Sequence, residues 1–178
     1  MKYFALLVSA LFLLPACTDT RHAVSPATVQ TQTCGSIKTL HVVGDVYLAS
    51  QPSAEDYALL KDRGVKAVID LRTDKEDRGF EEGATLKALG IDYIELPWNG
   101  PDQLTDAKLD AMRKALRNAK RPVMMKCGSS NRVGAGWLAY RVLDEGVALE
   151  TAVAEAKQVG LRTPAYEAKA RAYISARQ

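Results

Sequence analysis

The stretch Arg121-Pro-Val-Met-Met-Lys-Cys127-Gly-Ser-Ser-Asn-Arg132-Val-Gly-Ala-Gly-Trp-Leu-Ala-Tyr140 decides the fold. A short apolar run after a proline, at 123–125, is typical of a buried strand, and the apolar spacing of 133–143 is typical of a packed helix. Between the two lies a small polar loop that opens with Cys127 and closes with Arg132. The sequence therefore predicts a strand, a tight loop and a helix in direct succession.

The polar loop is suited to binding an anion. Backbone N–H groups of such a loop, together with the positive end of the following helix, attract an oxyanion. Arg132 adds a permanently charged, bidentate guanidinium, and Cys127 lies beneath the expected anion, where the same field favours a nucleophilic thiolate. The alternative is a small buried apolar cysteine. The Gly, Ser and Asn residues that follow Cys127 favour the anion loop.

Composition limits the classes of function. The 178 residues are 47% hydrophobic and 25% charged, as expected of one globular domain. The formal net charge of +3 provides no basic field of the kind that binds nucleic acid, so no nucleic-acid partner is expected. Two histidines and three scattered cysteines have no metal-ligand spacing. We therefore expect chemistry without a metal or other cofactor.

The first residues have the pattern of an export signal. Residues 1–16 form the predicted signal peptide, with Lys2 followed by an apolar segment that is too short to span a membrane as a mature helix. Leu14-Pro15-Ala16-Cys17 resembles the bacterial lipobox, although proline is unusual at its middle position. The alternative is an ordinary secretory signal cleaved nearby. The sequence thus predicts an exported, periplasmic protein, anchored to a membrane through a lipid on Cys17.

Residues 17–36 are rich in Thr, Ser, Gln and Pro and are predicted to form a flexible tether before a domain at 37–178. Cys34 lies in this tether. In an oxidising compartment Cys34 and Cys127 could form a disulfide, either as a stable cross-link or as a reversible guard on a reactive thiol. The other interpretation is that Cys34 is an idle thiol.

The remaining pattern alternates strands and helices. Strands are predicted at 40–43, 46–49, 65–71 and 91–96, and helices at 80–89, 149–159 and 164–176, with two more that begin at the N-caps Ser53 and Thr105. This alternation predicts an α/β fold with a central, mostly parallel sheet flanked by helices.

Two loops follow the carboxyl ends of predicted strands, where open α/β sheets bind their ligands. Arg72 leaves the strand at 65–71 directly and is a candidate anion-binding residue, whereas 74–78 is interpreted as a solvated charged loop. The second loop, 97–102, is rich in Pro, Gly and Asn, which regular elements do not contain.

Several stretches together resemble a known family, the bacterial phosphatase-like domain of beta-lactamase hydrolase-like proteins, a relative of dual-specificity and tyrosine phosphatases. The resemblance runs from about Ile37 to Tyr140 and is carried by 46–53, 64–72, 90–97 and 122–132. It implies a cysteine-phosphatase fold, a phosphorylated substrate, and hydrolysis of phosphate monoesters through a thiophosphate intermediate.

The resemblance also implies roles for individual residues. Cys127 is the expected nucleophile, and Asp102 stands in the place of the general acid, with Asp74 and Asp106 as alternatives. The residues expected to bind the phosphoryl oxygens are Gly128, Ser129, Ser130, Asn131, Arg132 and Arg72.

The loop departs from the phosphatase pattern in four ways. Four residues separate Cys127 from Arg132, whereas tyrosine phosphatases have five. Rhodaneses share the shorter spacing, so sulfur transfer through a Cys127 persulfide is an alternative function. Lys126 stands where the family usually has histidine, Ser130 where it usually has glycine, and Val133 where tyrosine phosphatases often have Ser or Thr. These departures leave a third hypothesis, a non-catalytic anion-binding or redox-sensing domain.

Overall fold

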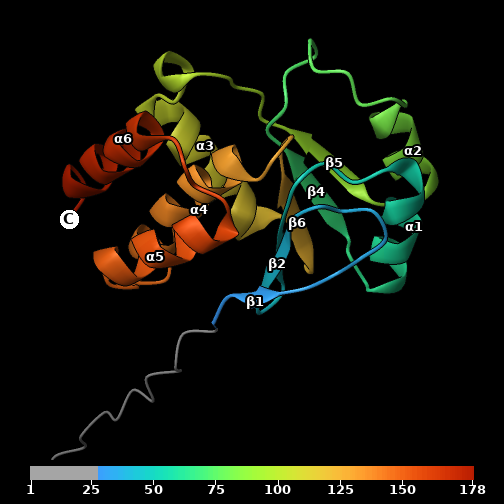
Figure 1. The fold of residues 1–178 in the computed structure, drawn as a ribbon, viewed down its shortest axis with the longest axis horizontal. Coiled ribbons are helices and arrows are strands. Elements are labelled where there is room, and N and C mark those ends of the chain that lie inside the picture. Colours follow the sequence, from blue (N-terminus) through green and yellow to red (C-terminus); the bar gives the residue numbers. More distant parts are fainter. Residues whose placement is uncertain (1–27) are drawn as a thin grey trace, which may run out of the picture.

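The computed structural model describes residues 28–178, which form a six-stranded sheet between two layers of helices (Figure 1). The strand order is β1-β2-β3-β6-β4-β5. Neighbours β1 to β3 pair antiparallel, and β3, β6, β4 and β5 pair parallel. The predicted mostly parallel sheet is therefore confirmed. The strands are β1 (Gln30–Thr31), β2 (Leu40–Val43), β3 (Val46–Ala49), β4 (Ala67–Asp70), β5 (Asp92–Glu95) and β6 (Val123–Lys126).

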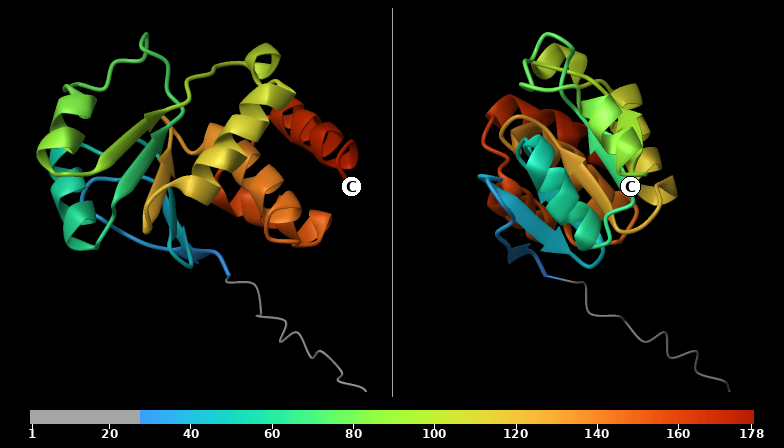
Figure 2. Two further views of the ribbon diagram at one scale, coloured as in Figure 1. Left: turned by 180° about the vertical axis from the view of Figure 1, so that it is seen from behind. Right: turned by 90° about the vertical axis from the view of Figure 1, so that its right-hand side faces the viewer.

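The helices are divided unequally between the two faces of the sheet, as Figure 2 shows. One face carries α1 (Ala54–Asp62) and α2 (Glu82–Ala88). The opposite face carries α3 (Asp106–Asn118), α4 (Asn131–Leu143), α5 (Leu149–Val159) and α6 (Pro164–Ser175), and a one-turn helix, η1 (Pro101–Gln103), precedes α3. A separate hydrophobic cluster fills the space on each side of the sheet. Over residues 28–178, no helix combines the length and the apolarity needed to cross a membrane.

Helix α4 is the centre of the larger layer. It is buried on almost every side, between the sheet and the helices α3, α5 and α6. Gly134 makes this close packing feasible, because a Cβ there would lie 2.7 Å from Cβ of Leu161 and 2.8 Å from the carbonyl oxygen of Ala156. Gly134 thus allows α4 to contact the end of α5 and the chain that leaves it.

Local sequence signals account for the starts of α1 and α3. Ser53 and Asp56 form the predicted capping box at the start of α1, and Thr105 caps α3 by accepting a hydrogen bond from the Lys108 N–H. Helix α4 begins at Asn131, two residues before the apolar pattern begins. Its first turn therefore includes Arg132.

The predicted tether at 17–36 ends too late, because 28–36 packs on the domain. Strand β1 pairs with β2, and the Cys34 side chain is only 2% exposed. The backbone N–H of Ser36 donates to Oδ1 of Asp56 at 2.8 Å. Hydrogen bonds and one small buried side chain fix this polar segment, which composition alone does not reveal. The signal peptide and Cys17 lie outside the described residues.

Candidate active site

Cys127 follows β6 at the centre of the sheet and is 1% exposed. Its backbone N–H donates to the Ala49 carbonyl oxygen at 3.2 Å, and the Leu71 N–H donates to the Lys126 carbonyl oxygen at 3.0 Å. Neighbouring strands on both sides therefore fix the start of the polar loop. The loop lies at the carboxyl edge of the parallel strands, where the sequence predicted a site.

The loop turns into α4 through a left-handed residue. Ser130 has φ 63° and ψ −4°, and its side chain is fully buried. This region favours glycine, and a residue with a Cβ costs roughly 1–2 kcal/mol there. The turn places Asn131 and Arg132 in the first turn of α4, while Gly128 and Ser129 remain exposed. Solvent thus reaches the loop on the side of Gly128 and Ser129.

Arg132 is held by both loops that follow β4 and β5. Its Nη1 donates to the carbonyl oxygens of Leu71 at 3.1 Å and Trp98 at 2.8 Å, and to Oε1 of Glu76 at 2.7 Å. Its Nη2 donates to Oε2 of Glu76 at 2.6 Å. A guanidinium has five N–H groups, so these contacts leave donors on Nε and Nη2 for an anion. Burial lowers the pKa of Arg132, but Glu76 and the nearby Cys127 produce a net rise.

Glu76 is the residue that the sequence analysis missed, since its loop was interpreted as solvated. Its carboxylate binds the outer edge of Arg132 in a bidentate ion pair and lies 3.4 Å from Nε of Arg72. Partial burial raises the pKa of Glu76, but hydrogen bonds from Arg132 and the Thr73 N–H hold it at about 2. The available signal was position, because the loop leaves β4 at the same edge of the sheet as Cys127.

Arg72 lies beside the site rather than on the anion loop. Its Nη1 donates to Oε1 of Gln51 and its Nη2 to the Asp77 carbonyl oxygen, each at 2.6 Å. Within residues 28–178, no hydrogen bond joins Arg72 to 127–132. In this geometry Arg72 braces the loop that carries Glu76.

Lys126 points to the opposite side of the sheet from Cys127. Its fully buried ammonium contacts Asp70 at 2.8 Å and Glu82 at 2.5 Å. Arg78 binds the same two carboxylates at 2.9 Å. Burial raises the pKa of Asp70, but Lys126 and Arg78 hold it at about 2. This network ties the end of the loop at 72–79 to the sheet.

A cleft of about 690 Å³ borders Glu76. It lies between the loops that follow β4 and β5, and its lining residues are Thr73, Asp74, Lys75, Glu76, Pro97, Asn99 and Gln103. Trp98 anchors the second loop, with its ring 4.9 Å from the Tyr166 ring, and the Gly100 N–H donates to the Tyr166 hydroxyl at 3.2 Å. The cleft therefore has one well-anchored wall next to the clamp on Arg132, which is its bidentate ion pair with Glu76.

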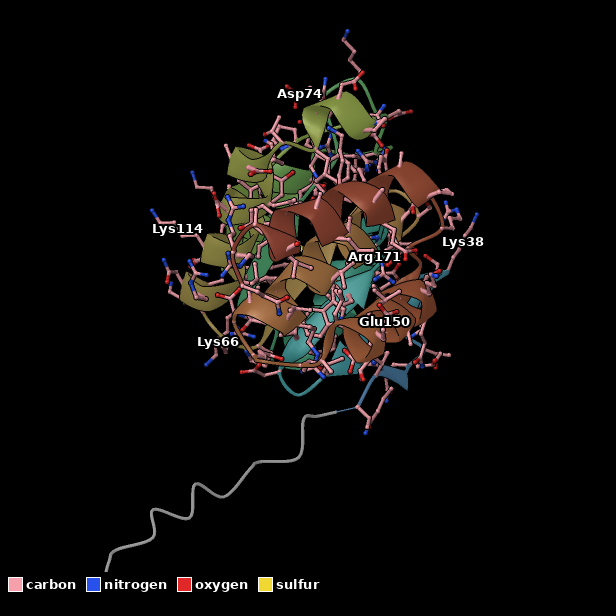
Figure 3. The ribbon with its side chains drawn as sticks, turned by 90° about the vertical axis from the view of Figure 1, so that its left-hand side faces the viewer. Lys38, Lys66, Asp74, Lys114, Glu150 and Arg171 are labelled. Atoms are coloured by element: carbon pink, nitrogen blue, oxygen red, sulfur yellow. The ribbon has the colours of Figure 1, made fainter. Side chains whose placement is uncertain are left out.

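The three candidate general acids lie in different surroundings. Asp102 is exposed in η1, on the loop that forms one wall of the cleft, and within 28–178 no hydrogen bond or ion pair joins it to the anion loop. Asp74 lines the cleft directly and lies at the top of the molecule in Figure 3. Asp106 forms an ion pair with Arg177 at 3.2 Å, which ties it to the end of α6.

The two described cysteines are unpaired and lie on opposite faces of the sheet. Cys127 belongs to the cluster packed against α3 to α6, and Cys34 to the cluster beneath α1 and α2. Burial raises the pKa of the Cys34 thiol, against the opposing effect of Arg63. In this geometry Cys34 is a packed core residue.

Comparison with known proteins identifies the family. Residues 39–143 match the family described as "Beta-lactamase hydrolase-like protein, phosphatase-like domain". The chain belongs to this family. A curated relative, the beta-lactamase hydrolase-like protein of Agrobacterium fabrum, is 28% identical over 112 residues, which are 61% of this chain and 26% of the relative. The chain thus spans about a quarter of that protein's length.

Solved structures agree with this assignment. P. aeruginosa TpbA has a TM-score of 0.63 and 28% identity over 85% of this chain and 91% of its own. A cysteine-to-serine variant of TpbA in complex with pTyr scores 0.63 at 27% identity, with coverage of 85% and 90%. The Siw14 catalytic core scores 0.64 at 21% identity, with coverage of 81% and 87%, and shows the fold alone. The domain therefore has a cysteine-phosphatase fold, as the resemblance implied.

The bidentate contact predicts that Glu76 holds Arg132 in place, so that its loss should be measurable. Replacing Glu76→Gln should lower kcat/KM for an aryl phosphate by roughly 10- to 100-fold, because a small displacement of Arg132 misplaces the anion. Since the carboxylate pKa of about 2 lies below its ordinary value of 4.5, the contribution of the ion pair to stability is complete above about pH 4.5 and is lost as the pH falls toward 2. Glu76→Gln should therefore also weaken the acid dependence of Tm over that range.

The matched control is Glu81→Gln, which removes an exposed carboxylate from the start of α2. It should leave kcat/KM within about twofold of the native value, as expected of an exposed substitution. Equal losses for the two variants would show that net charge, and not the clamp on Arg132, controls the rate.

Proposed function

We propose that this domain hydrolyses phosphate monoesters through a covalent thiophosphate on Cys127. The observation that carries the proposal is one loop in which a buried cysteine, solvent-facing backbone at Gly128 and Ser129, and a clamped Arg132 converge. Donors that are already in place stabilise charge on the phosphoryl oxygens without reorganisation during the reaction. Family membership and the TpbA structures support the same assignment.

The reaction takes place in two displacements at phosphorus. The Cys127 thiolate attacks, a P–S bond forms, and the ester P–O bond breaks. The leaving oxygen takes a proton from a carboxylic acid, for which Asp102 is the proposed donor and Asp74 the alternative. Water then attacks phosphorus and gives its proton to the same carboxylate. The P–S bond breaks, and inorganic phosphate and the thiolate are released.

The substrate is proposed to carry a phosphorylated hydroxyl whose organic part enters the cleft beside Glu76. The complex of a TpbA variant with pTyr supports a phosphorylated aromatic group as a ligand of this fold. The cleft is bordered by Pro97 and Asn99 on one side and Thr73 and Lys75 on the other. An aryl phosphate is therefore a suitable first probe.

The domain is also proposed to act outside the cytoplasm, as a periplasmic protein anchored through a lipid on Cys17. The support is the sequence alone, because the apolar segment at 3–14 and the lipobox-like 14–17 precede the described residues. Metabolic labelling with a fatty acid in a bacterial host should mark the native chain and not a Cys17→Ala variant. Labelling of both would place the lipid elsewhere.

The test of the chemistry is to identify the group that Cys127 accepts. The reduced protein is incubated with an aryl phosphate, acid-quenched and analysed by mass spectrometry, and a second sample is treated with thiosulfate and cyanide. We expect phosphate release and one phosphoryl group on the peptide that contains Cys127. A persulfide on that peptide, with thiocyanate formed and no phosphate released, would instead establish the sulfur transfer suggested by the four-residue spacing of the loop.

A further inference from the structure

The connection between α5 and α6 is built against the anion loop (Figure 1). Oδ1 of Asn131 accepts the backbone N–H groups of Arg162 at 2.9 Å and Thr163 at 3.3 Å, and its Nδ2 donates to the Thr163 hydroxyl at 2.7 Å. Gly160 packs so closely on Ser130 that a Cβ at Gly160 would lie 3.0 Å from the Ser130 Cβ. The loop that binds the anion therefore also fixes the backbone of Arg162.

The Arg162 side chain lies on the exposed part of that loop. Its Nη2 donates to Oγ of Ser129 at 2.6 Å, and its Nη1 donates to the carbonyl oxygens of Ser129 at 3.2 Å and Gly160 at 3.3 Å. Arg162 is exposed, as are Ser129 and Gly128. A guanidinium thus lies beside the solvent-exposed part of the loop.

Charge pairing distinguishes Arg162 from the other arginines near the site. The others form ion pairs with carboxylates: Arg132 and Arg72 share Glu76, and Arg78 contacts Asp70 and Glu82. Within 28–178, Arg162 forms no ion pair with a carboxylate, and its side-chain partners are the neutral oxygens of Ser129 and Gly160. Its positive charge is therefore available to a ligand.

With a phosphate bound, the loop would carry excess negative charge that the Arg162 guanidinium could offset. A bound phosphate dianion and Glu76 together carry more negative charge than Arg132 and Arg72 neutralise. The phosphate to be cleaved can be held by Arg132 and the backbone N–H groups of the loop, which leaves Arg162 for a second group of the substrate on the side of Ser129. Arginine binds carboxylates and phosphates through paired N–H groups.

We infer that Arg162 is a specificity-determining residue that binds a second anionic group of the substrate, next to the phosphate that is cleaved. The inference rests on the proposed phosphatase function and names its preferred substrate class, phosphate monoesters that carry an adjacent carboxylate or phosphate. On binding, the second anion displaces the Ser129 hydroxyl from Nη2 of Arg162, and no covalent change takes place at this residue.

Three small probes separate this preference from catalysis. Phenyl phosphate has one anionic group, 3-carboxyphenyl phosphate adds a carboxylate, and 1,3-phenylene bisphosphate adds a phosphate. The measured quantity is the ratio of kcat/KM for each two-anion probe to that for phenyl phosphate, at low and high salt. In the native protein we expect ratios above one that fall as salt screens the contact.

Arg162→Gln should reduce the ratios by about five- to tenfold, mainly through KM, as expected for one partly exposed charge contact. Arg162→Lys should keep most of the preference, because it keeps the charge. Lys114→Gln removes another exposed charge, from α3 (labelled in Figure 3), and should leave the ratios unchanged. The carboxylate and phosphate probes show which second anion is favoured.

Two outcomes would overturn the inference while leaving the phosphatase proposal intact. One is native hydrolysis of phenyl phosphate with no preference for either two-anion probe. The other is an equal loss on all three probes in Arg162→Gln, through kcat and without rescue by lysine, which would show that Arg162 only supports the loop. Absence of phosphate release from every probe would reject the proposed function, and the inference with it.

Discussion

Replacing Cys127→Ser is expected to reduce phosphate release from an aryl phosphate by at least about 10³-fold. Serine keeps the shape of the side chain, but its hydroxyl remains protonated at neutral pH and needs a general base. His41, the histidine that the structure describes, lies on β2, which β3 separates from β6, and its ring contacts the Thr31 hydroxyl at 3.3 Å. Steady-state kinetics on the native protein and the variant measure the effect.

Binding should survive this substitution, since Arg132 and the backbone N–H groups of the loop remain. Inorganic phosphate should therefore bind the native and Cys127→Ser proteins with Kd values within a few-fold, as measured by calorimetry. This separates the loss of the nucleophile from the collapse of the anion loop, which would abolish binding as well.

Cys34→Ala is the matched control, because Cys34 is an equally buried thiol in the other hydrophobic cluster. It should retain the activity of the reduced native protein at a temperature below its Tm. If Cys127→Ser kept its activity, or if Cys34→Ala lost as much, Cys127 would not be the nucleophile. Activity that appears in the native protein only after reduction, and that Cys34→Ala shows without reductant, would support the alternative of a redox guard.

The fold could be predicted because its signals are local. Caps at Ser53 and Thr105 and the apolar run of β6 identify elements without knowledge of their neighbours. The strand, polar loop and helix around 127–132 were also predictable, because the proposed nucleophile, the turn and the arginine lie within one stretch. Asn131 and Ser130 were assigned to the loop, and the structure shows that they also hold the α5–α6 connection.

The clamp on Arg132 could not be predicted in the same way. Glu76 lies 56 residues from Arg132 in the sequence, inside a run of charged residues that is indistinguishable from a solvated loop. Its role depends on the strand order, which places β4 directly beside β6. Arg162 was missed for the same reason, since only the packing of α5 against α4 brings it to Ser129.

Substituting Lys126→Met is expected to lower the free energy of unfolding by about 3–5 kcal/mol. The Lys126 ammonium is fully buried between Asp70 and Glu82. The pairing of β4 with β6 places Lys126 opposite Asp70. Oε1 of Glu82 also accepts a hydrogen bond from the Tyr57 hydroxyl. Removing one cation leaves two buried carboxylates with Arg78 as their remaining charged partner. Urea unfolding followed by circular dichroism measures the difference.

The pH dependence provides a second readout of the same network. The pKa of Asp70 is about 2 in the folded chain, below its ordinary value of 3.8, so its contribution to stability is complete above about pH 4 and is lost as the pH falls toward 2. Without Lys126 this pKa should rise, because burial then acts against a weaker opposing charge. The variant should therefore begin to lose stability at a higher pH than the native protein when the pH is lowered.

Lys66→Met is the matched control, since Lys66 is an exposed lysine immediately before β4, and its loss should change stability by no more than about 0.5 kcal/mol. The double variant Lys126→Met with Glu82→Gln should recover part of the loss, because it removes the one negative charge that Arg78 does not balance. If Lys126→Met were as stable as the native protein, the buried network would not be what holds 72–79 against the sheet. The position of the Glu76 carboxylate would then depend only on its own ion pairs with Arg72 and Arg132.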